Sequence, residues 1–261
     1  MKILAFDTAT PATSVALAPG DGRMLTRRHD PAQGERPGHQ ALLLTYAVEL
    51  LDEAGLSFKD LDRLAVGVGP GTFTGLRIGV ATARALAQAH ALDLVGISTL
   101  HALAAAHALT AATRDAADAH AAPRDEAAAP AAATILPVID ARRGEAFAAA
   151  WDAAGVTDPA ATPLLAPAAL TPDALVAAVQ ELPSAPVGIG DGALRFREQL
   201  ELAGVLVPAG DSPSHQVDAA AHCRLAGAAR PHARDEVLPA YLRLPDAELA
   251  LRRRAAGIHR S

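Results

Sequence analysis

The feature that most constrains the fold of this chain is a short pattern that occurs twice. Residues 3–7 (ILAFD) and 136–140 (LPVID) each run four mostly apolar residues into an aspartate, and a polar turn and a second apolar strand follow. Later in each half, a strand ends in a glycine turn that opens a helix, at residues 67–71 and 188–192. The repetition predicts two lobes built from the same hairpin-and-helix unit. Because an aspartate after a strand is common in α/β proteins, chance similarity is the alternative to duplication.

The composition is that of a folded chain with room for two lobes. Of its 261 residues, 51% are hydrophobic and 20% are charged, which excludes wholesale disorder. The net charge of −6 and the 3% aromatic content are unlike a freestanding nucleic-acid binder, so we expect contact with nucleic acid only through a partner. The single cysteine, Cys223, excludes an intramolecular disulfide and a cysteine zinc site.

No segment resembles a membrane anchor or a signal peptide. No apolar run reaches the roughly 18 residues that a membrane span needs. Asp7 interrupts the N-terminal apolar run too early for a signal-peptide core. We therefore expect a soluble, cytoplasmic protein.

Turn signals and helical periodicity divide the chain into four parts. Helices are predicted in the first part over about residues 39–54, 74–91 and 99–113, and a hairpin is predicted to turn on residues 142–144. The predicted parts are a first lobe at 1–113, an Ala/Pro-rich linker or loop at 114–133, a second lobe at 134–229, and a C-terminal tail at 230–261.

A glycine-rich turn is the first candidate binding element. Gly67, Gly69 and Gly71 lie between a predicted buried strand and the start of a helix, where free N–H groups and the helix dipole can hold an anion. The candidate residues for an anion or nucleotide contact are Asp7, Gly69, Gly71, Thr72 and Arg77. The spacing matches neither a phosphate loop nor a dinucleotide fingerprint. We therefore favour the alternative, in which the glycines permit a tight turn and close packing.

Four segments carry a resemblance to a known family. Residues 65–87 (AVGVGPGTFTGLRIGVATARALA), 3–10 (ILAFDTAT), 140–147 (DARRGEAF) and 238–243 (LPAYLR) resemble the TsaB family, and together they span nearly the whole chain. The resemblance implies an α/β, actin-like and sugar-kinase-like (ASKHA) fold with a duplicated pair of lobes. At the position of Asp7, enzymes of that fold carry an acidic residue near phosphate and metal.

The resemblance also implies a function. TsaB is the non-catalytic, dimerising subunit of the bacterial tRNA threonylcarbamoyladenosine complex, with a TsaD-like catalytic paralogue and a TsaE-like ATPase as partners. TsaD transfers a threonylcarbamoyl group from its adenylate to the tRNA adenosine next to the anticodon. A chain of this kind would contact tRNA only indirectly, and it could form a homodimer when free.

Small residues recur every fourth position in the helix after the glycine turn, at Gly75, Gly79, Ala83 and Ala87. Such a stripe allows close packing against the protein's own sheet or against another helix. The resemblance favours an interface formed with the helix at 39–54, because the two helices offer more apolar positions than one sheet face needs. The candidate interface residues are Leu42, Leu43, Tyr46, Leu50, Gly75, Leu76, Gly79, Val80 and Ala83. An arginine at position 76 or 80 is then expected to block association without unfolding the chain.

A complete metal site is not expected. TsaD-like enzymes carry two histidines four residues apart, so that both imidazoles face one ion on a helix. Here His101 is followed at that spacing by Ala105, and His107 lies about 240° around the helix. The sequence therefore predicts no metal, no cofactor and a scaffolding role.

Nucleophilic catalysis is not expected either. The serines lack a Gly-x-Ser-x-Gly elbow, and His222 and Cys223 diverge by about 100° on a helix. No catalytic residue is assigned, and we expect Asp7 and Asp140 to be structural. A small-molecule kinase or ATPase of the actin-like fold is the alternative function, and a protease is the third. The basic run Arg252–Arg254 is expected to be a solvated tail, with tRNA contact as its alternative.

Overall fold

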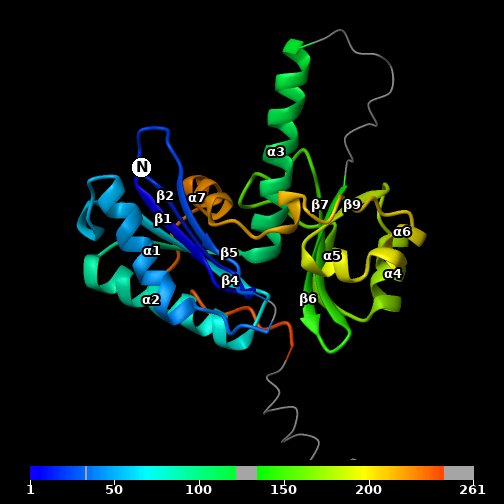
Figure 1. The fold of residues 1–261 in the computed structure, drawn as a ribbon, viewed down its shortest axis with the longest axis horizontal. Coiled ribbons are helices and arrows are strands. Elements are labelled where there is room, and N and C mark those ends of the chain that lie inside the picture. The colour runs from blue at the N-terminus through cyan, green and yellow to red at the C-terminus, as the bar shows by residue number, and fades with distance from the viewer. Residues whose placement is uncertain (33, 122–133, 244–261) are drawn as a thin grey trace, which may run out of the picture.

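The first lobe is built around a five-stranded mixed sheet. The computed structural model describes residues 1–32, 34–121 and 134–243. The strands stand in the order β3-β2-β1-β4-β5, with neighbours antiparallel among the first three and β4 and β5 parallel to β1 (Figure 1). Their bounds are Ile3–Asp7 (β1), Thr13–Ala18 (β2), Leu25–His29 (β3), Arg63–Gly69 (β4) and Asp93–Ser98 (β5). The carboxyl ends of β1 and β4 therefore lie at one edge of the sheet, which faces the second lobe.

The second lobe repeats this topology. Its strands stand in the order β8-β7-β6-β9, with β6 antiparallel to β7 and parallel to β9. Their bounds are Thr134–Arg142 (β6), Glu145–Asp152 (β7), Leu165–Leu170 (β8) and Pro186–Ile189 (β9). At the outer edge, Leu206 pairs in parallel with Val187, in the place of a fifth strand. Because β1 and β6 hold equivalent places, the duplicated actin-like fold expected from the sequence is confirmed.

Helices cover both faces of the first sheet because its strands alternate apolar side chains to the two sides. Leu4 and Phe6 of β1 pack beneath helices α1 (His39–Glu53) and α2 (Phe73–His90). Ala5 points to the opposite side, toward helix α7 (Ala219–Ala228). All three β1 side chains are fully buried.

Helix α7 lies in the first lobe, although the sequence placed it at the end of the second. It packs against β1, β2, β4 and α3. Its small side chains, such as Ala219 and Cys223, meet Ala16 and Ala65 of the sheet. Small residues on both surfaces allow the helix to approach the sheet closely. The sequence does not show this match, because the two surfaces come from distant parts of the chain. The second lobe is therefore shorter than the predicted range of 134–229.

Helix α3 runs from Thr99 to Ala121, longer than the predicted 99–113. Its last turns fall in the segment predicted to be a linker. The prediction missed them because an alanine-rich helix shows no apolar periodicity in the sequence, although alanine is the strongest helix former. Near its start, Leu100 and Leu103 pack in the core of the second lobe with Ile135. Helix α3 thus joins the two lobes (Figure 1). The rest of the predicted linker, residues 122–133, lies outside the described residues.

Short helices complete the second lobe. Thr171 caps the first of them, accepting a hydrogen bond from the N–H of Ala174 at 3.3 Å. Their bounds are Pro172–Gln180 (α4), Asp191–Arg195 (α5) and Arg197–Leu202 (α6). Two 3₁₀ turns complete the chain: Phe58–Asp60 lies between α1 and β4 in the first lobe, and Pro213–His215 lies before α7.

The predicted tail is in part a packed segment. Val237 is buried in the core of the first lobe, and the N–H of Ala240 donates to the carbonyl oxygen of Val68 at 2.7 Å. Leu242 packs against the core of the second lobe. Residues 244–261, including the basic run Arg252–Arg254, lie outside the described residues. Within the described ranges, no helix is both long and apolar enough to cross a membrane.

Candidate functional site

Asp7, at the carboxyl end of β1, is enclosed by groups of the chain itself. The side chain of Asp7 is only 1% exposed. His222 Nε2 lies 3.0 Å from its Oδ2, the Thr99 hydroxyl donates to the same oxygen at 2.7 Å, and the Ala9 N–H donates to Oδ1 at 2.7 Å. A Cβ atom on Gly67 would stand 1.8 Å from Oδ2. The carboxylate therefore has partners at both oxygens and no free space beside β4.

His222 is the titratable side chain that faces the buried carboxylate of Asp7. This side chain is fully buried on α7, with Nδ1 at 3.3 Å from the carbonyl oxygen of Asp218 and Nε2 facing Asp7. Burial opposes ionisation of Asp7, but the hydrogen bond and charge of His222, with the bonds from Ala9 and Thr99, outweigh it and hold the pKa of Asp7 below its usual value.

Sequence reasoning missed this pair. Asp7 and His222 come from opposite ends of the chain, and no local spacing relates them. His222 was considered only beside its neighbour Cys223. That thiol is buried against the carbonyl oxygens of Ile3 and Ala16, and burial raises its pKa to about 12. Cys223 is therefore a packing residue, as the sequence predicted for it.

The glycine turn closes over the same edge of the sheet. A Cβ atom on Gly75 would stand 1.9 Å from the carbonyl oxygen of Thr8, and one on Gly71 would stand 2.3 Å from that of Ala9. The Thr72 N–H donates to Ala9 O at 2.7 Å, and the Thr8 hydroxyl donates to Gly75 O at 2.7 Å. Backbone atoms of residues 8 and 9 thus lie directly against the start of α2. The geometry is that of close packing, the alternative that the sequence favoured.

The remaining candidates for an anion contact face elsewhere. Gly69 has a φ of +103°, which only glycine adopts readily, and it bends the chain after β4. The Arg77 guanidinium lies 3.8 Å above the ring centroid of Phe73, and its Nε donates to the Tyr241 hydroxyl at 3.1 Å. Arg77 is exposed whereas Asp7 is buried, and none of the contacts described above joins them.

Asp140 stands at the equivalent place in the second lobe. Arg195 Nη1 lies 2.8 Å from its Oδ2, and Arg142 Nη1 lies 3.6 Å from the same atom. The Arg142 N–H donates to Oδ1 at 2.8 Å. Both arginine side chains are about half exposed, at 44% and 59%. Asp140 therefore anchors an ion-pair group at the surface, and its role is structural in the described contacts.

His101, the first half of the compared metal motif, is a structural residue. Its Nε2 lies 2.7 Å from the carbonyl oxygen of Val156, and its ring stacks on Trp151 with centroids 5.0 Å apart. Burial lowers the pKa of His101, so the neutral ring donates to the carbonyl. Ala105 is buried in the core. In the described part of the chain, no three His, Cys, Asp or Glu side chains are grouped so as to hold a metal ion.

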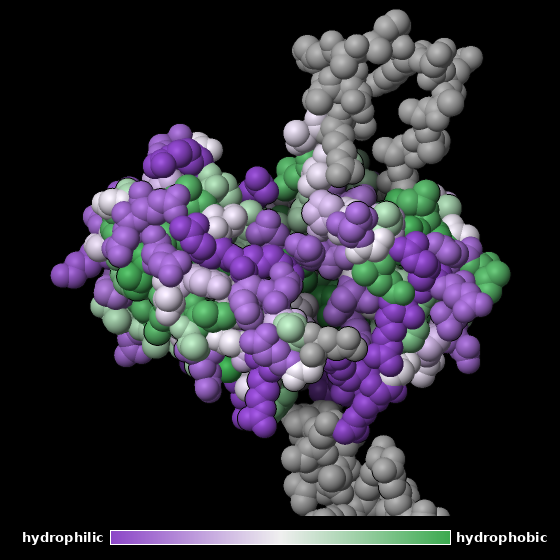
Figure 2. Space-filling model, viewed as in Figure 1, coloured by the Kyte–Doolittle hydropathy of each residue, from purple (hydrophilic) through white to green (hydrophobic). Residues whose placement is uncertain are grey.

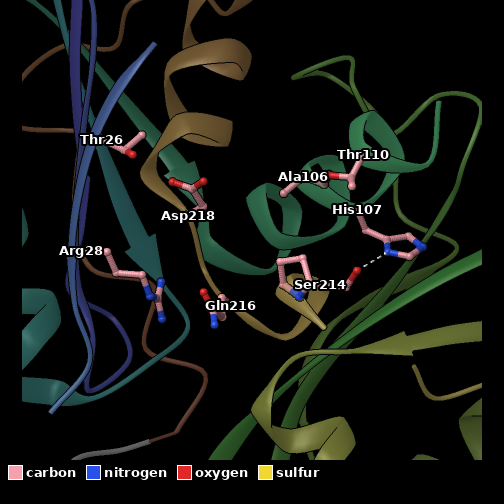
Figure 3. A pocket seen from close by; sticks show the side chains of 9 residues that line it. Thr26, Arg28, Ala106, His107, Thr110, Ser214, Gln216 and Asp218 are labelled. Carbon is pink, nitrogen blue, oxygen red and sulfur yellow. Dashed lines mark hydrogen bonds between the residues drawn. The ribbon is translucent and has the colours of Figure 1, made fainter. Parts of the chain in front are cut away.

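A cavity of about 160 Å³ lies where strand β3, helix α3 and the segment before α7 meet (Figure 3). Its polar lining includes Arg28, Gln216 and Asp218. His107 Nδ1 and Ser214 Oγ lie 2.9 Å apart in the same wall. Asp218 Oδ1 accepts from an N–H at the start of α7, which it caps. The described polar contacts of this cavity join elements of the two lobes.

A second cavity of about 280 Å³ lies in the cleft between the lobes and shares Arg28 and Gln216 with the first. Arg28 is held by Asp30, with Nη2 and Oδ1 2.5 Å apart, and it also donates to the carbonyl oxygen of Val217. His215 Nδ1 lies 3.2 Å from the Gly190 carbonyl oxygen. The charged groups described here already have partners in the chain.

The candidate interface residues divide into two groups. Leu42 and Tyr46 of α1 are half-buried. The other seven have their side chains, or the glycine backbone, inside the core of the chain: Leu43, Leu50, Gly75, Leu76, Gly79, Val80 and Ala83. The small-residue stripe of α2 therefore packs on the chain's own first lobe.

Two exposed apolar residues on α1 were missed. Leu44 is 46% exposed and Val48 is 44% exposed, and they lie four residues apart on one face of the helix. The excess of apolar positions in residues 39–54 was the available signal. It did not reveal which positions face outward, because leucines occupy both sides of the helix.

Comparison with known families and proteins points in one direction. A model of the family described as TsaD, tRNA N6-adenosine threonylcarbamoyltransferase, matches residues 33–169. The TsaB protein of Escherichia coli K12, described as a tRNA threonylcarbamoyladenosine biosynthesis protein, is 40% identical over 95 residues, which are 36% of this chain and 39% of that protein. A tRNA N6-adenosine threonylcarbamoyltransferase of Ligilactobacillus salivarius is 36% identical over 105 residues, 36% of this chain and 31% of that one. The match to the first curated relatives thus spans about two fifths of their length.

Solved structures match over a larger part of the chain. The structure of YeaZ from Pseudomonas aeruginosa has a TM-score of 0.69 and 27% identity, and the match covers 92% of this chain and 99% of that one. A second structure from that organism, described as an uncharacterized protein similar to the peptidase YeaZ, has a TM-score of 0.68, 27% identity and 93% and 99% coverage.

Proposed function

Since the chain belongs to the tRNA N6-adenosine threonylcarbamoyltransferase (TsaD) family and is a homologue of the TsaB proteins, we propose that it is a non-catalytic subunit that supports a TsaD-like catalytic chain. The homology supports a role in the threonylcarbamoyladenosine modification of tRNA. A TsaE-like ATPase is the further partner of the proposed complex, which acts where tRNA is modified, in the cytoplasm.

One observation carries the non-catalytic part of the proposal. The carboxylate at the end of β1 is enclosed by His222, Thr99 and Ala9, and backbone atoms close the start of α2 over it. An actin-like enzyme needs that edge open for phosphate and metal. Here the chain fills it with its own groups, which favours a supporting role over a small-molecule kinase or ATPase.

The docking surface of the proposal is the outer side of α1 and its neighbour α2. Both helices cover the same face of the first sheet, so their outer sides form one surface (Figure 1). Leu44 and Val48 expose nearly half of their area there, whereas half-buried Leu42 and Tyr46 lie on the opposite flank of α1, because residues two apart on a helix point about 200° apart. Two neighbouring exposed apolar side chains on one helix face favour association with another protein surface. A related subunit with equivalent helices would complete a helical interface.

The docking test replaces the exposed residues and not the buried ones. Leu44→Arg and Val48→Arg are expected to abolish co-elution with the TsaD-like subunit in size-exclusion chromatography while the chain stays folded. Leu202→Arg is the matched control, because Leu202 is 84% exposed on the second lobe. Arginine at Leu76 or Val80 would unfold the lobe, since these side chains are 0% and 3% exposed. Unchanged co-elution of both α1 variants would place the interface elsewhere.

The functional test is reconstitution. The TsaD-like and TsaE-like subunits with this chain are expected to modify tRNA, and the α1 variants are expected to lose that activity together with association. If the free chain forms dimers, the same variants are expected to make it monomeric. Modification of tRNA by the chain alone would contradict the proposal.

A further inference from the structure

The first residue of α1 is a buried histidine, His39. Its side chain is only 3% exposed, and its Nδ1 lies 2.8 Å from the hydroxyl oxygen of Thr13, on β2. The other ring nitrogen, Nε2, is buried and has no hydrogen-bond partner among the described residues. The helix whose outer side is proposed to dock therefore begins on a titratable group that is hydrogen-bonded at only one of its two nitrogens.

A second histidine stands on the same side of the sheet. Thr13 pairs in register with His29, the last residue of β3. Val15 and Leu17 of β2 face α1, and alternate residues of a strand share a face, so Thr13 and His29 face that helix too. The Nδ1 atom of His29 is also buried without a partner in the described structure. Two imidazole rings thus neighbour one hydroxyl group under the start of α1.

Protonation of His39 is unfavourable in this place. Burial lowers the pKa of the ring, and the negative charge of Asp7, on β1, opposes that shift only in part. The neutral ring either donates to the Thr13 hydroxyl or accepts from it, whereas the protonated ring donates from both nitrogens. For Nε2 the described residues provide no acceptor. A proton on His39 therefore adds a charge and an unpaired donor under the start of α1.

The far end of α1 is held to the sheet by charge, and its start is not. Arg27 of β3 lies 3.4 Å from Glu49 and 2.7 Å from Glu53. At the near end, Gly38 precedes the helix without a side-chain cap. Helix α2 contributes apolar side chains such as Val80 to the core that it shares with α1. Further titratable residues on α1 and on the segment before it are exposed or half-buried: Asp30, Glu35, Arg36, Tyr46 and Asp52.

We propose that His39 makes the docking surface pH-sensitive: when it takes up a proton, the first turn of α1 leaves the sheet and association with the TsaD-like subunit weakens. The inference rests on the proposed function. Leu44 lies little more than one helical turn after His39, so a displaced first turn disturbs the exposed apolar pair. Figure 2 shows hydrophobic side chains among hydrophilic ones on the outer side of α1 and α2, where this surface lies.

The direction and size of the effect follow from proton linkage. In the opened helix His39 is an ordinary histidine with a pKa of about 6.5, and in the closed helix its pKa is lower. Opening is therefore favoured below about pH 6.5, by at most about tenfold for each pH unit. Above that value the closed helix has no such penalty.

Association of the full chain with the TsaD-like subunit is measured at pH 7.5, 6.5 and 5.5. The parent is expected to bind up to about tenfold more weakly at pH 5.5 than at pH 7.5. His39→Gln keeps an amide beside Thr13 and cannot be protonated, so its affinity is expected to change less. His90→Gln, at the end of α2, is the matched control and is expected to keep the pH dependence of the parent. The partner is the same in every mixture, so its own titration cancels.

Hydrogen exchange of the isolated full chain reports the opening itself. After correction for the intrinsic exchange rate, protection of residues 40–44 is expected to fall between pH 7.5 and pH 5.5, while that of residues 49–53 stays nearly constant. Protection that is unchanged in the first turn would overturn the inference, even if His39→Gln fails to fold. Equal pH dependence of association in the parent and His39→Gln would overturn it too. The proposed function is judged separately, by co-elution of the parent with the TsaD-like subunit at pH 7.5.

Discussion

The ends of β1 and β6 occupy equivalent places in the two lobes, and each carries an aspartate. Asp7 is 1% exposed and faces a buried histidine and a threonine hydroxyl. Asp140 has a side chain that is 11% exposed and lies between two half-exposed arginines. The first aspartate is part of a core, whereas the second is part of a surface.

The neighbouring helices make this difference. Helix α7 comes from the C-terminal part of the chain but packs on the first sheet, and it brings His222 to Asp7. At Asp140 the cation comes from Arg195 of the short helix α5. Duplication thus supplies one strand–aspartate unit twice, and the helix that reaches it decides whether the aspartate stabilises the interior or holds charged groups at the surface.

The largest effect is expected from breaking the buried pair. His222→Ala leaves the buried Asp7 carboxylate without the imidazole that faces it at 3.0 Å, and removing one partner of a buried pair costs about 3–5 kcal/mol. The equivalent change in the second lobe, Arg195→Ala, is expected to cost roughly 0–1 kcal/mol because Arg195 is 44% exposed. Urea unfolding of the two variants measures both. Equal losses of stability would contradict the contrast between the two aspartates.

A smaller effect is expected from adding one methyl group where the first lobe closes. Gly75→Ala places a Cβ atom 1.9 Å from a backbone oxygen of Thr8, so the start of α2 must move. Overpacking of this kind costs about 1–3 kcal/mol. Gly155→Ala is the control, because no atom lies within 4 Å of that position. A Gly75→Ala variant as stable as the parent would show that the turn is not closed.

The change of folding stability with pH is expected to be smaller than the effects of these two substitutions. His101 lies between the lobes, and burial lowers its pKa, so the unfolded chain takes up its proton first as the pH falls. Its contribution to stability is therefore present above the unfolded pKa of about 6.5 and is lost below it. Unfolding followed by Trp151 fluorescence from pH 7 to pH 5 should show this loss in the parent and a flatter profile in His101→Gln. An equally steep profile in the variant would rule out His101.

The contribution of Asp7 to stability is also lost as the pH falls, but in a more acidic range than that of His101. Its lowered pKa means that its contribution is present above the unfolded value of about 3.9 and is lost as the pH falls through the folded value. An Asp7→Asn variant, compared with the parent below pH 4, isolates this contribution from that of His101.

Much of the fold could be predicted because the informative patterns are local. The strand at residues 3–7 and the turn at 142–144 follow from short runs of apolar, polar and glycine residues. The resemblance of residues 65–87 and the repeated aspartate gave the two-lobed topology. By contrast, the place of α7 and the length of α3 depend on packing between alanine-rich surfaces, which leave no period in the sequence.

The site was predicted less well for the same reason. The sequence identified Asp7 and the glycine turn, but the partner of Asp7 stands near the other end of the chain. The helices of the docking surface were chosen by their apolar content, yet Leu76 and Val80 serve the core while Leu44 and Val48 face outward. The apolar content of a helix does not tell which of its apolar residues face the core and which face outward. That distinction needs the structure, which shows the side of the helix that the sheet covers.

Calorimetric titration of the isolated full chain with Mg²⁺ and ATP tests most directly whether the edge at β1 is filled. With His222 and the glycine turn holding Asp7, we expect no saturable heat at millimolar nucleotide. Stoichiometric binding of ATP that disappears in a folded Asp7→Asn variant would show an open nucleotide site and contradict the account.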